Sequence, residues 1–220
     1  MVTDKLLLIA CKQSYKKHPK LKGYDCRKIN IKNDSCTIYF NDDNIIISFA
    51  GTNDMLDVLE DIKFIKTKTK YGKVHKGFND VYLDLEIYVQ GVLHNLYSNK
   101  PKSIYITGHS LGGAVALLCS INFVYRNMVK KVVTFGCPRV GDRKWKTIYN
   151  KTTKFTTIRY VHGGDIITKI PKLFYYHVGE YKHIPRKTKT KNYWGFIRDF
   201  FVRKVNNIKD HDINNYIKDF

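Results

Sequence analysis

Residues 103–114 read SIYITGHSLGGA, and this stretch decides the fold. The apolar run from Ile104 to Ile106 is typical of a buried strand, and the small residues from Gly112 onward are typical of a closely packed helix. Between them, residues 108–112 match the pattern G-x-S-x-G, in which the serine lies on a sharp turn between a strand and a helix. The flanking glycines allow neighbouring backbone to approach without a clash with Cβ. The stretch therefore predicts that the hydroxyl of Ser110 projects from the edge of a sheet as a nucleophile.

Strand-like and helix-like segments alternate on both sides of this turn. We expect strands at 37–40, 45–49, 103–107, 132–135 and 156–161, and helices from Leu6 toward Tyr15 and at 55–65, 78–96 and 114–125. The turn-like residues 41–44 between the first two strands indicate a hairpin. Strands that alternate with helices predict an α/β fold, a mostly parallel sheet with helices on both faces. At ~150 residues per domain, the length of 220 residues predicts a single domain, 1–220.

The pattern weakens from 186 to 220. Residues 186–191 are typical of a basic loop, after which Trp194, Ile197, Phe200 and Phe201 recur at roughly helical spacing. We expect a helix that packs on the sheet. The alternative is a helix at a membrane surface, because basic residues flank the aromatic ones, namely Arg198, Arg203 and Lys204.

The composition gives the chain a large positive charge. Its 39 lysines and arginines against 19 acidic residues leave a net charge of +20, and most of the basic residues are lysine. Such a charge attracts anionic membranes or nucleic acid nonspecifically, although a lysine excess also fits the codon usage of an AT-rich genome. Arginine is scarce, and the sequence shows neither a helix-turn-helix nor an RNA-binding aromatic signature. We therefore expect no specific nucleic-acid partner.

Cysteine usage and hydropathy exclude several further classes of protein. The five cysteines form an odd set without C-x-x-C spacing, which predicts neither a disulfide framework nor a zinc site. No metal-ligand cluster or nucleotide-binding loop is visible, so the sequence predicts no cofactor. The apolar run from Leu6 to Cys11 is too short for a signal-peptide core, and no stretch approaches the ~20 apolar residues of a membrane span. We expect a cytoplasmic protein that makes at most peripheral contact with an anionic membrane.

A serine nucleophile needs a base that takes its proton and an acid that orients the base. In α/β-hydrolases the chain order is serine, then acid, then histidine, which restricts the search to residues after 110. Asp165 follows the strand at 156–161 and the turn at 162–164, where the sheet brings side chains to its carboxyl edge. Asp142 is the competitor, although its position after Val140-Gly141 is more typical of a surface turn. We expect Asp165 to be the acid.

Three histidines follow Asp165. His177 lies inside the strand-like run 174–178, where a partly buried histidine with a structural partner is the commoner case, and His183 lies in a basic stretch that ends at Pro185. His211 lies between Asp210 and Asp212 in a loop, which suits a proton carrier held on a rigid scaffold. The sequence favours His211 as the base.

Acyl transfer also needs amide donors where the tetrahedral oxyanion forms. The N–H of Leu111 is one candidate. The other is expected in the loop after an earlier strand, and the strand 45–49 leads directly into Ala50-Gly51-Thr52. Thr52 offers both its amide and its hydroxyl, although a Gly-Thr pair is equally typical of a plain turn.

Taken together, these blocks resemble the class 3 lipases of the α/β-hydrolase superfamily, a family typified by secreted fungal triacylglycerol lipases. The resemblance spans residues 45–216. Six blocks carry it in the family's order: Phe49-Ala50-Gly51-Thr52, Asp57-Val58-Leu59-Glu60-Asp61-Ile62, Val74-His75-Lys76-Gly77-Phe78, residues 106–114, Thr134-Phe135-Gly136-Cys137-Pro138-Arg139-Val140-Gly141, and Asp210-His211 with Tyr216. Asp165 falls where the family has its acid before a proline-containing loop, here with Pro171.

The resemblance implies a catalytic triad, an oxyanion hole and a lid. Ser110, Asp165 and His211 would form the triad, while Thr52 and Leu111 would form the oxyanion hole. Residues 55–61 would form a short amphipathic lid whose apolar face comprises Met55, Leu56 and Leu59. Two positions depart from the family pattern. Ala50 replaces its usual arginine, which removes a charge that braces the oxyanion loop, and Val58 replaces a frequent tryptophan.

The expected function is a serine-dependent hydrolase of carboxylic esters that acts on acyl glycerides or phospholipids through an acyl-enzyme. Lysines after the lid favour docking on anionic phospholipid, namely Lys63, Lys66, Lys68, Lys70 and Lys73. The alternative is a catalytically silent hydrolase fold that binds lipid without turnover, a hypothesis that only Ala50 supports. Labelling of Ser110 by a fluorophosphonate distinguishes the two.

Overall fold

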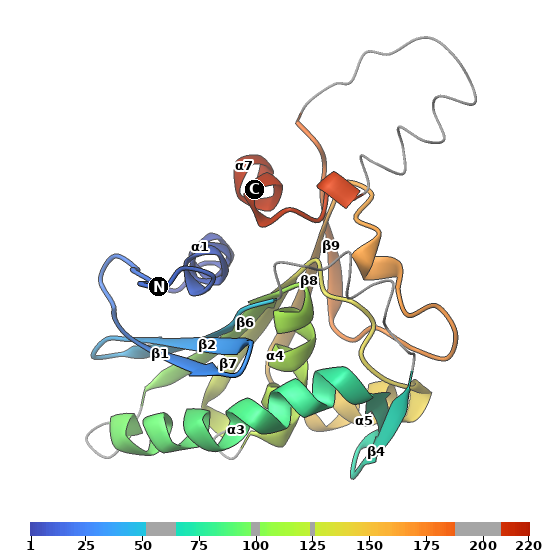
Figure 1. Ribbon diagram of the computed structural model, residues 1–220, viewed down its shortest axis with the longest axis horizontal. Helices are drawn as coiled ribbons and strands as arrows, with labels where there is room; N and C mark the ends of the chain where they lie inside the picture. Colours follow the sequence, from blue (N-terminus) through green and yellow to red (C-terminus); the bar gives the residue numbers. More distant parts are fainter. Residues whose placement is uncertain (52–64, 98–101, 124–125, 188–207) are drawn as a thin grey trace.

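A seven-stranded sheet forms the centre of the computed structural model, which describes residues 1–51, 65–97, 102–123, 126–187 and 208–220 (Figure 1). The strand order is β1-β2-β3-β6-β7-β8-β9. The strands are β1 Asp25–Ile31, β2 Asp34–Phe40, β3 Asn44–Phe49, β6 Ser103–His109, β7 Val129–Phe135, β8 Thr156–His162 and β9 Glu180–Ile184. From β3 to β9 neighbouring strands are parallel, whereas β1, β2 and β3 pair antiparallel. The expected mostly parallel sheet is therefore confirmed.

Helices cover both faces of the sheet. On one face lie α1 Asp4–Ser14 and α7 Ile213–Asp219, and on the other lie α3 Lys76–Tyr97, α4 Leu111–Asn122 and α5 Arg143–Thr152 (Figure 1). A separate hairpin of β4 Lys66–Thr69 and β5 Gly72–His75 precedes α3, and the short 3-10 helices are η1 Arg126–Met128 and η2 Ile167–Lys169. Within the part of the chain that the structure describes, no helix is long and apolar enough to cross a membrane.

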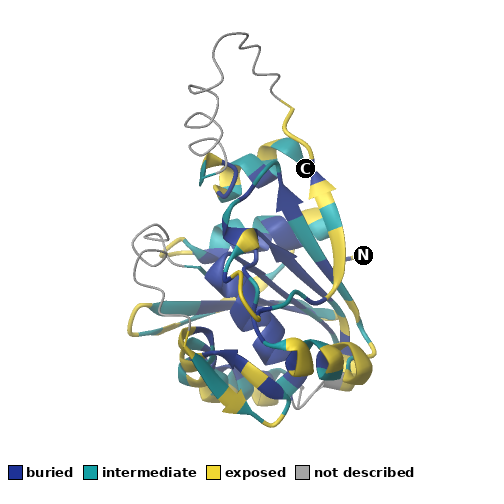
Figure 2. Cartoon of the chain, turned by 90° about the vertical axis from the view of Figure 1, so that its right-hand side faces the viewer, coloured by how far each residue is buried: buried dark blue, intermediate teal, exposed yellow. Residues whose placement is uncertain are grey.

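Alternating side chains of the central strands supply two hydrophobic cores, one on each face of the sheet. Ile45 and Ile47 of β3 are fully buried in the core beneath α3 and α4, whereas Ile46 between them is fully buried in the core beneath α1. Val132 and Val133 of β7 divide between the two cores in the same way. Strands that are buried on both faces appear in the sequence as continuous apolar runs. This is why the sequence predicts these strands correctly. Figure 2 shows the buried interior in dark blue.

Several expected elements are confirmed and several others were missed. The structure confirms α1, the β2–β3 hairpin, α3, β6, α4, β7 and β8. The sequence did not indicate β1, β4, β5, β9, α5 or α7, and the run at 174–178 is a loop rather than a strand, since the next strand begins at Glu180. The missed segments carry many lysines and other polar residues, which leaves too few apolar positions for a clear period. The helices expected at 55–65 and across 194–201 fall largely or wholly outside the described residues.

Candidate active site

Ser110 lies on the turn between β6 and α4, where the sequence predicts a nucleophile. Its backbone has φ 61° and ψ −130°, a conformation that a residue with a side chain rarely adopts. Its side chain is fully buried. Backbone strain of about 1–3 kcal/mol at such a position persists only when the surrounding structure imposes it, and it is typical of functional sites.

Close backbone contacts impose this turn. A Cβ on Gly108 would lie 2.1 Å from the carbonyl oxygen of Gly112, and a Cβ on Gly112 would lie 2.1 Å from the carbonyl oxygen of Phe49. Both distances are far below any contact that a real side chain makes, so only glycine fits at either position. The two glycines of the G-x-S-x-G pattern are therefore required by packing.

The structure brings Asp165 and His211 together at the carboxyl edge of the sheet. Asp165 follows β8 and is fully buried, and its two carboxylate oxygens lie 3.0 Å and 2.9 Å from Nδ1 of His211. A carboxylate only accepts hydrogen bonds, so Nδ1 of His211 is the donor in this contact, and Nε2 is the ring atom that could accept a proton from serine. The pair rests against Gly136, where a Cβ would lie 2.9 Å from both side chains.

Two further donors hold the Asp165 carboxylate. The Tyr216 hydroxyl donates to Oδ2 at 2.7 Å, and the amide of Ile167 donates to Oδ1 at 2.9 Å. Burial, followed by the negative charge of Asp165, raises the pKa of Tyr216 well above 10, which keeps this hydroxyl protonated as a donor. Tyr216 belongs to α7, so the last helix of the chain orients the acid.

The two atoms that would exchange a proton are both without a hydrogen bond. Ser110 Oγ and His211 Nε2 are buried, and neither has a partner among the described residues. The His211 ring stacks on the ring of His109, with centroids 4.7 Å apart, and His109 is the residue next to Ser110. The structure therefore orients the imidazole through Asp165 and His109, but it shows no hydrogen bond between Ser110 and His211.

His109 and Tyr15 form a hydrogen-bonded chain that the sequence did not reveal. His109 Nε2 lies 2.8 Å from the carbonyl oxygen of His211, so this nitrogen donates and Nδ1 accepts from the Tyr15 hydroxyl at 2.9 Å. The Tyr15 oxygen in turn accepts from the amide of Gly51 at 3.1 Å. Burial, and then the neighbouring His211, lower the pKa of His109 well below the usual 6.5, so its ring is neutral.

An ion-pair cluster fixes the loops that carry Asp165 and His211. Asp210 accepts from the Arg186 guanidinium, with Nε at 2.7 Å, and from the Gly164 amide at 2.6 Å. His162, at the end of β8, lies 2.7 Å from Oδ2 of Asp219 at the end of α7. Asp210 precedes His211 and contacts Gly164, the residue before Asp165, while Asp219 lies on the helix that follows His211. The contacts therefore restrict the movement of His211.

The expected oxyanion site is described only in part. Leu111 is the first residue of α4, where a backbone N–H has no partner within the helix. The loop after β3 runs beside the nucleophile, since a Cβ on Gly51 would lie 3.1 Å from the Cβ of Ser110. Thr52 follows immediately but lies outside the described residues, as do the expected lid residues Met55, Leu56 and Leu59. Their roles stay predictions.

The competing candidates have structural partners. Asp142 caps α5, where its Oδ1 accepts from the Trp145 amide at 2.8 Å. His177 Nε2 lies 2.7 Å from the carbonyl oxygen of Thr168, and His183 Nε2 lies 3.0 Å from that of Gly163. These contacts explain all three residues without catalysis.

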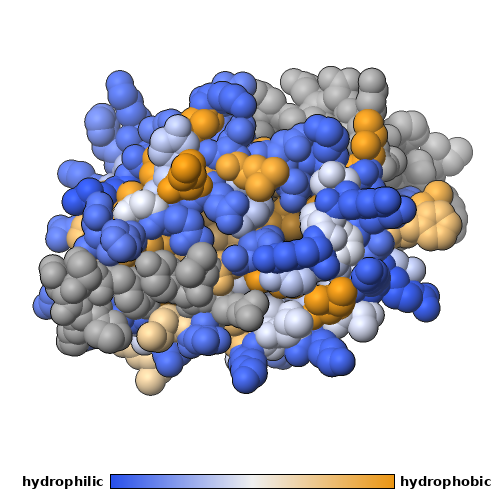
Figure 3. Space-filling view, turned by 90° about the horizontal axis from the view of Figure 1, so that it is seen from below, coloured by the Kyte–Doolittle hydropathy of each residue, from blue (hydrophilic) through white to orange (hydrophobic). Residues whose placement is uncertain are grey.

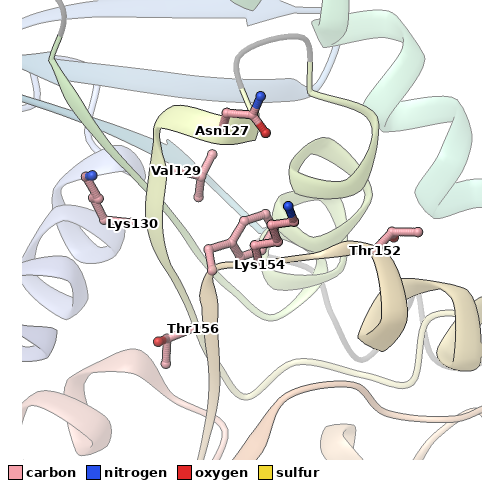
Figure 4. Close-up of a pocket in the computed structure, with 7 residues that line it drawn as sticks. Asn127, Val129, Lys130, Thr152, Lys154 and Thr156 are labelled. Atoms are coloured by element: carbon pink, nitrogen blue, oxygen red, sulfur yellow. The ribbon is translucent and has the colours of Figure 1, made fainter.

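A separate hollow lies at the opposite edge of the sheet. It has a volume of about 600 Å³ and is lined at the start of β7 and β8 by residues that include Val129, Lys130, Lys154 and Thr156 (Figure 4). Ser110 follows the carboxyl end of β6, whereas this hollow adjoins amino ends of strands. It is therefore not part of the candidate active site.

Comparison with known proteins places the chain in a family. The family model described as lipase (class 3) matches residues 46–175, more than half of the chain. Phospholipase A(1) DAD1 from Arabidopsis thaliana is 32% identical over 153 residues, which cover 58% of this chain and 34% of that protein. The lipase of Rhizomucor miehei is 31% identical over 147 residues, which cover 62% of this chain and 40% of that protein. The chain thus spans about two fifths or less of these two relatives.

Solved structures show the same fold. Lipase II from Rhizopus niveus superposes with a TM-score of 0.73 at 25% identity, over 86% of this chain and 80% of that one. A lipase from Rhizopus microsporus var. chinensis superposes with a TM-score of 0.67 at 28% identity, over 74% and 62%. The fold is accordingly that of the α/β-hydrolases, and the chain belongs to the class 3 lipase family.

Proposed function

We propose that this chain is a serine hydrolase of carboxylic esters that acts on acyl glycerides or phospholipids. The observation that carries the proposal is the hydrogen bond of 2.9 Å between Asp165 and His211, whose ring stacks on His109, the residue next to Ser110. Ser110 Oγ and His211 Nε2 are not hydrogen-bonded to each other or to any other described residue, so the proposal requires them to approach each other when the substrate binds. The family membership supports the same chemistry.

In the proposed mechanism, His211 Nε2 takes the proton of the Ser110 hydroxyl as its oxygen attacks the ester carbonyl carbon. Asp165 accepts from Nδ1 throughout and stabilises the imidazolium that forms. The tetrahedral intermediate then collapses, the alcohol leaves with the proton from His211, and the acyl group stays on Ser110. Water, activated by His211 in the same way, attacks the acyl-enzyme and releases the fatty acid.

The developing oxyanion needs donors at the head of α4 and in the loop after β3. We assign the amide of Leu111 to the first position and Thr52 to the second, because Gly51 runs beside Ser110. Loss of one such donor costs roughly 100- to 1000-fold in turnover. We also propose that Met55, Leu56 and Leu59 belong to a lid, and that this lid moves at a lipid surface.

The substrate class rests on relatives and on charge. One similar protein is named a lipase and another a phospholipase A(1), so neutral and phosphate-bearing acyl lipids both fit. The net charge of +20 favours an anionic surface, because each lysine close to such a surface contributes ~1 kcal/mol. Hydrolysis is expected to be faster on anionic than on neutral vesicles, and added salt is expected to remove the difference.

The experiment that tests the proposal compares the wild type with Ser110→Ala. The wild type is expected to release a chromogenic short-chain ester and to release fatty acid from defined glycerides and phospholipids, whereas the variant stays folded and inactive. Undiminished turnover by the folded variant refutes the proposal. A wild type that binds lipid without turnover would instead support the silent hydrolase fold, which the departure at Ala50 favours. The cytoplasmic location and the single domain stay predictions.

A further inference from the structure

The loop between η2 and β9 presents two large apolar side chains to water. Leu173 is 76% exposed and Phe174 is 72% exposed, and they are neighbours in sequence. Ile65, next to Lys66 at the start of the β4–β5 hairpin, is 50% exposed. Figure 1 shows the loop in orange at the right-hand margin of the molecule, near this hairpin. Adjacent exposed apolar side chains of this size indicate a surface that binds something.

The loop is held in this shape by basic side chains. Arg139 Nη1 donates to the carbonyl oxygens of Pro171 and Lys172 at 3.3 Å and 3.0 Å, and Lys66 Nζ donates to that of Phe174 at 2.9 Å. The same ammonium lies 4.5 Å from the centre of the Tyr175 ring. Phe174 has φ 58°, an unfavourable conformation for a bulky residue that these contacts maintain. The exposed pair is therefore presented by a braced loop.

The two segments that meet at this loop, residues 166–179 and 65–76, carry only positive charges. Residues 166–179 and 65–76 contain no aspartate or glutamate, and they contain seven lysines, including Lys66, Lys169 and Lys172. Lys169, Lys172 and Lys68 are exposed. An apolar tip flanked by lysines complements a bilayer with anionic headgroups, since the tip enters the acyl region while the ammonium groups bind phosphate.

A second pair of exposed apolar side chains, on α3, has a different setting. Leu83 and Ile87 of α3 are 53% and 73% exposed, but Asp80, Asp84 and Glu86 lie beside them in the sequence. Figure 3 views the molecule from the side of α3, where apolar side chains lie among hydrophilic ones. Acidic neighbours oppose contact with an anionic surface, so this pair serves as a matched control.

The loop is also tied to the candidate active site. Thr168 Oγ1 donates to the carbonyl oxygen of Asp165 at 2.8 Å, and His177, three residues beyond the exposed pair, lies 2.7 Å from the carbonyl oxygen of Thr168. The loop therefore leaves the same edge of the sheet as Asp165. A bilayer that receives the loop would lie near the edge that carries Ser110.

We propose that residues 171–174 form a membrane-docking loop, in which Leu173 and Phe174 enter an anionic bilayer while Lys66, Lys169 and Lys172 bind its headgroups. The inference rests on the proposed function only for the role of the loop, because lipid bound at this edge would be the substrate of the serine site. Binding itself requires no turnover. A second copy of the chain is disfavoured as the occupant, since two chains of charge +20 repel each other.

The test measures binding of the full chain to sedimented vesicles of phosphatidylglycerol and phosphatidylcholine, with Ser110→Ala as the background so that no lipid is consumed. Leu173→Ser/Phe174→Ser is expected to bind about 100-fold more weakly, since each buried apolar side chain contributes about tenfold or more. Leu83→Ser/Ile87→Ser is expected to bind like its parent. Circular dichroism establishes that each variant is folded.

A second pair of variants separates local charge from net charge. Lys169→Gln/Lys172→Gln is expected to weaken binding by about fivefold per lysine. Lys151→Gln/Lys154→Gln makes the same change in net charge at two exposed residues, one in the last turn of α5 and one just after it, and is expected to have a smaller effect. Equal binding by the apolar loop variant and its parent overturns the inference, as does equal weakening by the α3 pair. A loop variant that changes only the oligomeric state also overturns it and assigns the loop to contacts between copies. None of these results depends on whether the serine site is active.

Discussion

The Tyr15 hydroxyl lies 2.9 Å from Nδ1 of His109 and connects the two halves of the candidate active site. On one side it accepts from the amide of Gly51, the residue before Thr52. On the other, His109 donates to the backbone of His211 and stacks on its ring. One hydroxyl thus links the loop expected to stabilise the oxyanion to the loop that carries the base.

Replacing Tyr15 with phenylalanine should slow the chemical step. The variant removes the acceptor of the Gly51 amide and the donor to His109, and a buried polar group left without its partner costs about 1–3 kcal/mol. That penalty lowers the free energy of unfolding, and the loops before Thr52 and at His211 also lose their shared anchor. If this loosening removes about 1.4 kcal/mol of transition-state stabilisation, kcat on a soluble ester falls about tenfold with little change in KM. Tyr149→Phe is the control, because its buried hydroxyl meets Ser120 and Thr157 away from the site. An unchanged kcat in Tyr15→Phe would remove the proposed link.

Replacing Asp165 with asparagine should almost abolish turnover. An amide in place of the carboxylate favours the other tautomer of His211, in which Nε2 carries the proton and cannot accept one from Ser110. Comparable substitutions in serine triads lower kcat by about 10⁴-fold. Asp142→Asn is the matched control, since asparagine is an equally good N-cap for α5. Steady-state ester hydrolysis by the two variants decides between Asp165 and Asp142, and a loss confined to Asp142→Asn would reverse the assignment.

The glycines of the nucleophile turn should be irreplaceable, unlike a glycine elsewhere. In Gly112→Ala the new methyl group would lie 2.1 Å from the Phe49 carbonyl oxygen, so we expect a loss of about 3 kcal/mol or more in the free energy of unfolding. Gly91 lies inside α3 with nothing within 4 Å of an added Cβ, so Gly91→Ala should gain about 0.5–1 kcal/mol. Urea unfolding measures both. A mild effect of Gly112→Ala would mean that the turn is looser than described.

Stability should fall in acid because the pKa of His177 and the pKa of His109 are lowered in the folded chain. Burial, and then the nearby Arg159, lower the pKa of His177 to about 3 from 6.5. Below about pH 6.5, His177 binds a proton in the unfolded chain but not in the folded chain. Its contribution to the free energy of unfolding is therefore fully present above pH 6.5 and is lost as the pH falls toward 3. The slope is about 1.4 kcal/mol per pH unit for such a group. His109 acts in the same direction.

His177→Gln removes the His177 contribution and should flatten the dependence. Thermal unfolding of both proteins between pH 7 and pH 5 measures the difference, which should grow as the pH falls. Parallel curves would show that His177 already protonates in the folded chain.

The sequence was sufficient to select Ser110, Asp165 and His211 as candidates because triad chemistry requires particular residue types in a fixed chain order. The structure brings Asp165 and His211 into hydrogen-bond contact, and the triad itself stays a proposal. It was insufficient for Tyr15 and His109. His109 occupies a variable position of its motif, and Tyr15 reaches it only because α1 packs across β3 and β6. Such contacts depend on tertiary packing, which leaves no periodic signal in the sequence. The edge strands β1 and β9 were missed because exposed polar residues interrupt their apolar pattern.

Reaction with a fluorophosphonate probe tests the central claim most directly, because the probe bonds only to a serine that a neighbouring base activates. Mass spectrometry of the digested wild type should find one adduct, on the peptide that contains Ser110, and modification should be slowed at least 100-fold in His211→Ala. The folded Ser110→Ala variant should remain unmodified. An unmodified wild type, or modification of Ser110 at the same rate without His211, would contradict the proposed triad.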